Sequence, residues 1–490
     1  MKKTLGPWSL TALGIGAIIG SGIFVLTGTA AAGEYFKVNS ILHAQVLDLI
    51  VNFLRTGSTA NVLMHGRPPA GPSIAVSFLL VAVACSFAGL CYAELASMIP
   101  IAGSAYTYSY ATLGEIFAWI IGWDLILEYV VSNVVVAIGF GSYAKAQLAS
   151  FGLNLPDKWS SPVWQSGHWT GSFFNFPAFL IIFLLTILLV RGVRESAETN
   201  NIMVAVKIGA ILIFLLVGGM LVNPANWKPF APSGFGGIVT GGAIVFFTYI
   251  GFDSVSTAAE EAKNPQRDLP IGIIASLIVC SVLYIGVSIV LLGMMKYTNF
   301  VSGEASDSPV AYALKHLGAS HFAASVIVVG ALMGMLSSLL VFQYGQARIW
   351  YAMSRDGLFP KIFSAVHPRF KTPHWSTWIA GFAVGLPAGV FAVSDAADLA
   401  NIGTLFAFVL VSLGVILLRR NQPGRKRGFR VPLVPWFPLI SIILCGGLMT
   451  GLTVITWIRF VVWLVLGLCV YFLYSRRHSE FASASASEGV

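Results

Sequence analysis

The sequence predicts an all-α integral membrane protein in which about twelve helices cross the bilayer. Of its 490 residues, 57% are hydrophobic and only 10% are charged, and the mean hydropathy is +0.81. Soluble domains carry about 25% charged residues, so this chain has too few polar groups to cover a soluble fold of this size. Its apolar residues form continuous runs, whereas the strands of a membrane barrel alternate in polarity over about ten residues.

The apolar runs define twelve expected spans, at residues 8–33, 72–98, 105–143, 174–191, 198–222, 236–260, 269–295, 321–351, 376–394, 398–419, 435–455 and 457–475. The third run is longer than one span needs, so it is either a tilted helix or a helix with a turn. Because no long proline-rich linker divides the chain, residues 1–475 are expected to form one bundle. The Ser/Ala-rich tail, 476–490, is expected to be cytoplasmic and disordered.

The basic residues behind the net charge of +9 are distributed as a membrane topology predicts, and not as on a surface that binds nucleic acid. With a cytoplasmic N-terminus, most lysines and arginines fall in cytoplasmic loops, including the run Arg425–Arg430. This positive-inside pattern predicts a multi-pass protein of the cell membrane with both termini in the cytoplasm. The lipid bilayer is therefore an expected partner and nucleic acid is not, while protein partners stay unknown.

The five cysteines lie within apolar runs, and none forms a close Cys-x-x-Cys pair. Small buried hydrophobic side chains explain them better than a metal site or a disulfide. We therefore expect no metal and no cofactor. The sequence also contains no nucleophile–base or metal-ligand constellation, so an enzyme is not predicted.

Two spans are interrupted by glycine, the first at Gly14–Phe24 and the sixth at Gly241–Asp253. Glycine destabilises a helix by about 1 kcal/mol relative to alanine. Two such segments at corresponding positions indicate an inverted-repeat transporter with two broken helices at the bilayer midplane. The alternative is that the glycines only allow close helix packing, which suits Gly16 and Gly20 but not the full Gly20-Ser21-Gly22 triplet.

A broken helix exposes backbone groups that match an amino acid zwitterion. Free N–H groups at the start of a half-helix suit the carboxylate, and free carbonyls at the end of the preceding one suit the ammonium. The Ser21 hydroxyl either adds a hydrogen bond to the substrate or bonds its own helix. The residues expected to bind the backbone of the substrate are Ile18, Ile19, Gly20, Ser21, Gly22, Ile23, Phe247, Thr248 and Ile250. Phe247 is singled out because it follows a glycine-rich run that we expect to be unwound.

Ionisable residues within spans are costly, at about 2.5 to 3.5 kcal/mol each on insertion scales, and so indicate function. Glu128 is expected to face the substrate side chain or to carry a proton, while Asp124 one turn earlier is a structural candidate. Asp253 meets a cationic side chain or fixes the broken helix. Lys207 is either a snorkelling lysine or an ammonium that replaces a coupling sodium ion and couples transport to protons. Met335 is expected at the side-chain end of the pocket, and Ser338 is a further candidate there.

An insertion between the first two spans, 34–69, carries Leu42, Val46, Leu49, Ile50, Phe53 and Leu54 at helical spacing. This pattern predicts an amphipathic helix on the extracellular surface. The helix could cover the vestibule, contact a partner or lie on lipid, and the last interpretation is favoured.

Five motifs together carry a resemblance, at Gly14–Phe24, Pro100–Tyr106, Phe252–Thr257, Glu260–Pro270 and Arg348–Gly357. They resemble the amino acid–polyamine–organocation superfamily, and within it the bacterial homologues of the cationic amino acid transporters. The resemblance implies a LeuT-like five-plus-five inverted repeat, about 8–222 and 236–419, followed by peripheral helices at about 435–475. It also implies that Lys207 stands where sodium-coupled relatives bind sodium. The insertion is longer than the outer loop typical of the family.

The predicted function is secondary active transport, as proton-coupled uptake of L-amino acids. Glu128 and Asp253 favour cationic substrates such as arginine or lysine. Small neutral amino acids such as alanine or threonine are the alternative, because a protonated Glu128 accepts them as well. Amino acid–polyamine exchange by the same bundle is a further alternative, and a membrane receptor that does not transport is a third.

Overall fold

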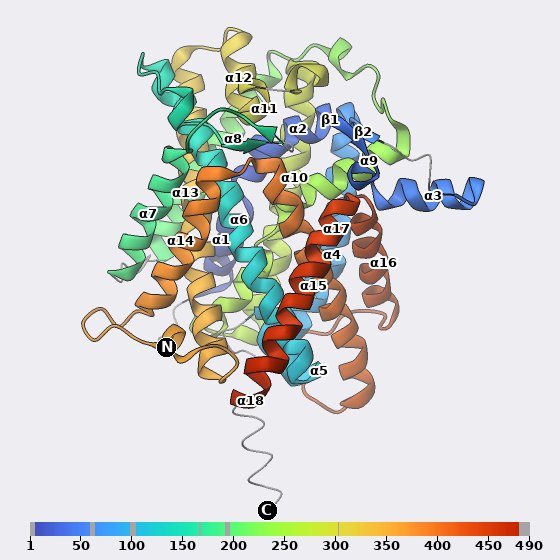
Figure 1. Cartoon of the computed structure of the whole chain (residues 1–490), viewed down its shortest axis with the longest axis vertical. Coiled ribbons are helices and arrows are strands. Elements are labelled where there is room, and N and C mark those ends of the chain that lie inside the picture. The colour runs from blue at the N-terminus through green and yellow to red at the C-terminus, as the bar shows by residue number, and fades with distance from the viewer. Residues whose placement is uncertain are drawn as a thin grey trace, which may run out of the picture.

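The computed structural model describes residues 5–58, 64–98, 104–165, 168–191, 197–301 and 303–479. Most of them are helical, and the long helices run side by side along the long axis of the molecule (Figure 1). The sequence motif at Pro100–Tyr106 and the tail 476–490 lie partly outside the described residues. The membrane-spanning, mostly helical class predicted from the sequence is confirmed.

The first half of the chain begins with the helix α1, which is followed by a π-helical turn, and continues through seven further helices. Their bounds are α1 Pro7–Ile18, the π-helical turn Gly22–Leu26, α2 Thr27–Ala32, α3 Val46–Thr56, α4 Ile74–Met98, α5 Ser104–Leu113, α6 Glu115–Ser150, α7 Phe176–Val190 and α8 Ala197–Gly219.

The second half contains a second interrupted segment and most of the remaining long helices. Their bounds are α9 Gly234–Val245, the 3-10 helices Phe246–Tyr249 and Phe252–Glu261, α10 Pro265–Met294, α11 Glu304–Asp307, α12 Pro309–His316, α13 His321–Arg355, α14 His374–Val390, α15 Val393–Asn421, α16 Trp436–Thr450, α17 Val454–Val470, the π-helical turn Tyr471–Ser475 and α18 Arg476–His478.

Within the described residues, eight helices are long and apolar enough to cross a membrane, and the bent pair at the start of the chain makes a ninth span. The helices α7 and α16 are apolar but shorter. The long third run contains two helices, α5 and α6, which are separated at Gly114 with φ +91°. The turn that we gave as one alternative for this run is therefore present.

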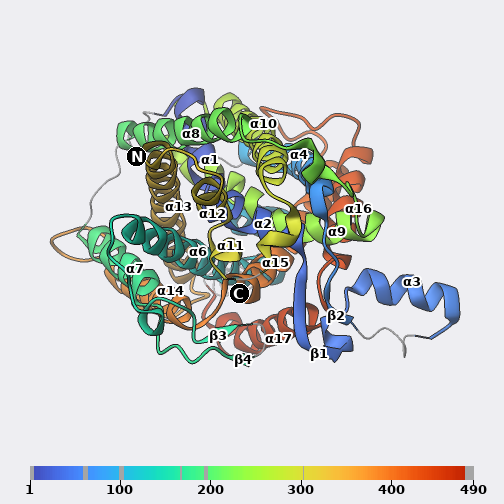
Figure 2. The ribbon, with the colours of Figure 1, turned by 90° about the horizontal axis from the view of Figure 1, so that it is seen from above.

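The bundle encloses its first segment. Helix α1 contacts α8, α10 and α13, and seen from above α1 and α2 lie inside a ring of longer helices (Figure 2). Helices α16 and α17 lie at the edge of the same view. The first segment is therefore placed where a central binding site would be, and the glycines of α1 allow the close approach, since a Cβ at Gly14 would lie 2.6 Å from Ser276 Oγ.

The insertion is folded onto the bundle as a small sheet and a helix. Strands β1, Glu34–Ser40, and β2, Met64–Arg67, pair antiparallel, with a 3-10 turn at Ile41–His43 and helix α3 between them. The predicted amphipathic helix is present, while the two strands were not predicted. A second short hairpin joins β3, Trp164–Gln165, to β4, His168–Trp169.

The basic loop after α15 is held by one buried carboxylate. Glu94, at the end of α4, accepts hydrogen bonds from Arg419 Nε at 2.9 Å, from Arg427 Nε at 3.1 Å and from the amide of Val431 at 2.7 Å. Charge-assisted bonds of this kind are the stronger ones in proteins. Part of the Arg425–Arg430 run thus fixes the connection between α15 and α16.

Candidate functional site

The first break lies at the glycine triplet that predicted it. Helix α1 ends at Ile18, Ile19 has extended backbone angles, and the chain becomes helical again at Ser21 and Gly22. The two parts of the segment are bent by 41°. The glycines therefore do more than allow close packing, and the predicted break of the first span is confirmed.

The second break begins later than we expected. Gly241 and Gly242 remain inside α9, where they pack closely: a Cβ at Gly241 would lie 2.8 Å from Ala70 Cβ. The expectation that the glycine-rich run before Phe247 is unwound is therefore wrong. Instead the chain tightens into a 3-10 turn at Phe246–Tyr249, and a second 3-10 helix starts after Gly251, whose φ is +117°.

The two breaks face each other. A Cβ at Gly22 would lie 2.7 Å from Thr248 Cγ2 and 2.9 Å from Thr248 Cα. A Cβ at Gly251 would lie 3.0 Å from the backbone carbon of Ala17. Each interrupted segment thus has a glycine packed against the backbone of the other segment. Only glycine, which has no Cβ, allows this close approach.

The carbonyls released at the end of α1 are bound by two side chains. Lys207 Nζ, on α8, donates to Gly16 O at 2.7 Å and to Ile19 O at 3.0 Å. Ser338 Oγ, on α13, lies 3.1 Å from Gly16 O and 3.0 Å from Ile19 O. Because Lys207 is 0% exposed, the snorkelling alternative for this residue is wrong. Its ammonium lies at the first break.

A tyrosine links the two breaks, and an asparagine binds the second. The hydroxyl oxygen of Tyr284, on α10, lies 2.9 Å from both Ile18 O and Thr248 O, so its one hydrogen is shared between the two carbonyls. Asn401 Nδ2, on α15, donates to Ala243 O at 2.8 Å and to Ile244 O at 3.3 Å. An uninterrupted α-helix would satisfy these carbonyls four residues later, so side chains replace the missing backbone bonds.

Donors remain at the start of the second half-helix. The first N–H groups of a helix have no partner within it, and Ser21 makes no side-chain cap bond there. The Ser21 hydroxyl is fully buried and has no hydrogen-bond partner among the described residues, so the bond to its own helix that we considered is not made. This N-terminus, with the amides of Gly22 and Ile23, suits an anion.

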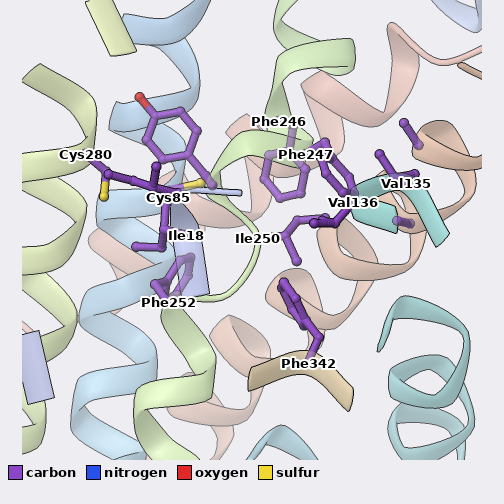
Figure 3. Close-up of a cluster of buried hydrophobic side chains, with 14 of the residues drawn as sticks. Ile18, Cys85, Val135, Val136, Phe246, Phe247, Ile250, Phe252, Cys280 and Phe342 are labelled. Carbon is purple, nitrogen blue, oxygen red and sulfur yellow. The ribbon is translucent and has the colours of Figure 1, made fainter. Parts of the chain in front are cut away.

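Apolar side chains surround the breaks. In Figure 3, Phe247 and Ile250 lie close to Val136 of α6, with Phe342 of α13 nearby, whereas Ile18 lies on the side of Cys85 and Cys280. Met335 is fully buried and stands one helical turn before Ser338, which contacts the first break. The start of the half-helix at Ser21–Ile23 therefore lies beside an apolar lining contributed by α6, α13 and the second break.

The buried carboxylates form a separate group. Glu128 is 1% exposed, and its electrostatic neighbours are Asp253 and Asp124. It precedes Val136, which lies opposite Gly20, by eight residues of α6, a separation of roughly 12 Å along the helix. Asp253 follows Gly251 by two residues. The two acidic residues that we expect near the substrate side chain, Glu128 and Asp253, thus interact with each other, with Glu128 about two turns of α6 from the first break.

Asp124 occupies a place left open by a glycine of α15. A Cβ at Gly403 would lie 2.6 Å from Asp124 Oδ1, and both carboxyl oxygens of Asp124 lack a hydrogen-bond partner among the described residues. The adjacent residue of α15, Thr404, lies at Glu128. The same helix thus contacts the second break through Asn401 and the carboxylates through Gly403 and Thr404.

Sequence reasoning missed Tyr284, Asn401 and Thr404. They are ordinary polar residues in apolar runs, and no spacing rule relates them to the breaks. Only the crossing of α10 and α15 over the interrupted segments gives them their partners. A search for polar residues on otherwise apolar helices would have found them as candidates, without their roles.

Replacing Tyr284 with phenylalanine is expected to lower both thermal stability and substrate affinity. The change removes one hydroxyl that serves two buried carbonyls, and each unsatisfied buried group costs about 1 to 3 kcal/mol. Thermal unfolding of the purified protein with and without substrate measures both effects. Tyr344→Phe is the matched control, because Tyr344 is 45% exposed. Equal behaviour of the two variants would contradict a role for Tyr284 in joining the breaks.

Comparison with known proteins adds to this geometry. A family model described as amino acid permease matches residues 5–480. The chain is similar to a methylthioribose transporter of Bacillus subtilis, with 46% identity over 98% of this chain and 95% of the relative. It is also similar to the branched-chain amino acid permease BcaP of Bacillus subtilis, with 45% identity over 98% and 94%. The chloroplastic cationic amino acid transporter 9 of Arabidopsis thaliana is 35% identical over 92% of this chain and 73% of the relative.

Proposed function

Because this chain belongs to the amino acid permease family, we propose that it is a secondary active transporter that takes up L-amino acids together with protons. The observation that carries the proposal is the facing pair of breaks, in which the Ser21 hydroxyl, without a partner among the described residues, and the start of the half-helix at Gly22 lie across from Thr248 of the second segment. In this proposal the broken segments belong to two inverted repeats of five spans, in a cell-membrane protein whose termini are cytoplasmic.

The substrate backbone would bind between the two segments. Its carboxylate accepts hydrogen bonds from the amides of Gly22 and Ile23 and from the Ser21 hydroxyl, at the positive end of a helix dipole. Its ammonium lies among the carbonyls of Ile18 and Thr248. Both lie within hydrogen-bond distance of the Tyr284 hydroxyl, and Ile18 O also accepts from the amide of Gly20 at 3.0 Å, so Thr248 O is the carbonyl with a second lone pair for the ammonium.

Lys207 would couple this binding to protons. Its protonated ammonium makes charge-assisted bonds to the two carbonyls at the end of α1. Deprotonation removes the charge and weakens these bonds, so the end of α1 is released when the proton leaves. This arrangement supports a proton in the role that sodium has in relatives, because a fixed ammonium already occupies the carbonyls.

For the side chain, the apolar lining favours neutral, apolar amino acids. Val136, Phe247, Ile250 and Met335 offer no charge near the break, and a relative named as a branched-chain amino acid permease is 45% identical. Cationic amino acids are the second candidate. Glu128 and Asp253 favour them, because an extended basic side chain could point along α6 towards these carboxylates.

Uptake into proteoliposomes tests the proposal. Liposomes without internal amino acid, given an inward proton gradient, should accumulate the amino acids that raise thermal stability in a screen of all common amino acids and polyamines. Accumulation only with preloaded counter-substrate would instead indicate exchange. Stabilisation without any transport would support a receptor.

Glu128→Gln is expected to weaken binding of arginine by about tenfold, equivalent to about 1.4 kcal/mol, and that of leucine much less. The change keeps the size of the side chain but removes the negative charge near the breaks. Isothermal titration with both ligands measures the difference, and Glu304→Gln is the control because Glu304 is exposed. If neither amino acid loses affinity, or both lose it equally, Glu128 does not read the charge of the substrate side chain.

A further inference from the structure

Helix α3 of the insertion has an apolar surface that no other part of the described chain covers. None of its residues is buried, and Phe53 and Leu54 are 56% and 78% exposed. Its polar residues gather on the opposite arc of the helix, at Asp48, Asn52, Arg55 and Thr56. Valine, leucine, isoleucine and phenylalanine fill the remainder of this helix, 46–56.

An ion pair attaches the insertion to the bundle next to α3. Arg67 donates to both carboxyl oxygens of Asp398 on α15 and also pairs with Glu34 at 3.4 Å. The Arg67 and Asp398 side chains are 7% and 6% exposed. A buried bidentate pair of this kind fixes geometry as well as adding energy. The strands that flank α3 are thereby bound to the bundle.

Backbone bonds fix the start of α3 as well. The amide of Val46 donates to Leu452 O at 3.2 Å, and the amide of Val454 donates to Ala44 O at 3.0 Å. Leu452 lies in the turn between α16 and α17, and Val454 is the first residue of α17. The first residue of α3 is therefore held at the tip of two helices whose outer faces are apolar, as Ile443 at 69% and Val465 at 52% exposure show.

From its first residue, Val46, α3 extends away from the bundle. In Figure 1 it runs roughly perpendicular to the long helices, at the height of the α16–α17 turn, and in Figure 2 it projects beyond the outline of the other helices. A helix in this position would overlie a bilayer that surrounds α16 and α17, at the level where these two helices meet. An amphipathic helix parallel to the bilayer is the geometry in which an apolar face enters the lipid while polar residues stay in water.

We propose that α3 is an interfacial helix that lies on the lipid surface at the α16–α17 end of the bundle, with its apolar face in the headgroup–acyl boundary. The occupant of the apolar face is lipid because the backbone bonds at Val46 and Val454 hold α3 beside the ends of α16 and α17, whose outer faces are apolar and exposed. The helix carries one acid and one base, Asp48 and Arg55, so the attachment is apolar and independent of lipid charge.

Spin labels on the two arcs test the proposal in the full-length protein in nanodiscs. Leu54→Cys and Arg55→Cys each receive a nitroxide, with Cys469→Ser removing the one exposed native cysteine. Oxygen, which concentrates in lipid, should relax the label at Leu54 severalfold more than a water-soluble nickel chelate does. The label at Arg55, one residue further along the helix, should show the reverse preference. Ile50→Cys and Thr56→Cys repeat the comparison on the same two arcs.

Two results would overturn the proposal. Strong relaxation by the nickel chelate at both positions would place α3 in water, and protection of Leu54 from both reagents would show that protein covers it. Spin–spin broadening at Leu54 would identify that protein as a second copy of this chain. Because all four positions are exposed or on a helix without buried residues, the labels leave the folded core intact, and uptake by the labelled proteins checks this.

Discussion

Replacing Lys207 with alanine is expected to abolish uptake driven by a proton gradient while amino acid binding persists. The side chain is fully buried, and its ammonium holds two carbonyls at the end of α1. Without a group that binds and releases a proton there, the gradient has no means to bias the position of α1. A ligand changes an equilibrium only through a difference in affinity between its states, and the proton would have none.

Binding is expected to persist because a second side chain also contacts the carbonyls at the first break. Ser338 Oγ remains within hydrogen-bond distance of Gly16 O and Ile19 O. The loss of affinity should therefore stay below about tenfold, or about 1.4 kcal/mol. Lys207→Met adds a nearly isosteric variant without the ammonium, which separates the loss of charge from the loss of volume.

The measurement pairs thermal-shift affinity with uptake at several pH gradients, using Lys315→Ala as the control, since the Lys315 side chain is 63% exposed. Wild-type accumulation by Lys207→Met would exclude Lys207 from coupling. If both Lys207 variants lose binding together with uptake, the residue shapes the site instead. Unchanged counter-flow exchange alongside lost accumulation is the pattern that supports coupling.

Two features of the sequence located the first break and the buried lysine. A Gly-Ser-Gly triplet is too unfavourable for an uninterrupted helix, and the backbone of the protein does break there. A lysine within an apolar span must find partners or reach water, and Lys207 finds carbonyls. The amphipathic pattern of the insertion likewise predicted α3, because a helical periodicity of 3.6 is read directly from the sequence.

The second break and its supports could not be placed in the same way. Gly241 and Gly242 have the composition of a break, yet they serve close packing against Ala70 and Leu448. The turn forms instead at Phe246–Tyr249, residues without unusual propensity, because Asn401 and Tyr284 satisfy the carbonyls that it releases. Such partners come from helices more than thirty residues away, so only the packed fold reveals them.

Gly22→Ala is expected to remove amino acid binding and uptake although it should favour the helix locally. Alanine in a helix is about 1 kcal/mol more favourable than glycine. The added methyl, however, would lie 2.7 Å from Thr248 Cγ2 and 2.9 Å from Thr248 Cα. Thr248 belongs to the 3-10 turn of the second break, and its hydroxyl donates to Val245 O at 2.7 Å. Neither its backbone nor its side chain can therefore move far to relieve the clash.

The clash is therefore expected to increase the distance between the two breaks. Overpacking of a buried contact costs about 1 to 3 kcal/mol, and separating the breaks misplaces the donors at Ser21–Ile23 relative to the carbonyls at Ile18 and Thr248. Gly446→Ala in α16 is the matched control, because nothing lies within 4 Å of the Cβ it would add. The control should retain uptake and gain slight thermal stability. Wild-type binding by Gly22→Ala would show that the substrate is held without contact between the two segments, and the site would then lie elsewhere in the bundle.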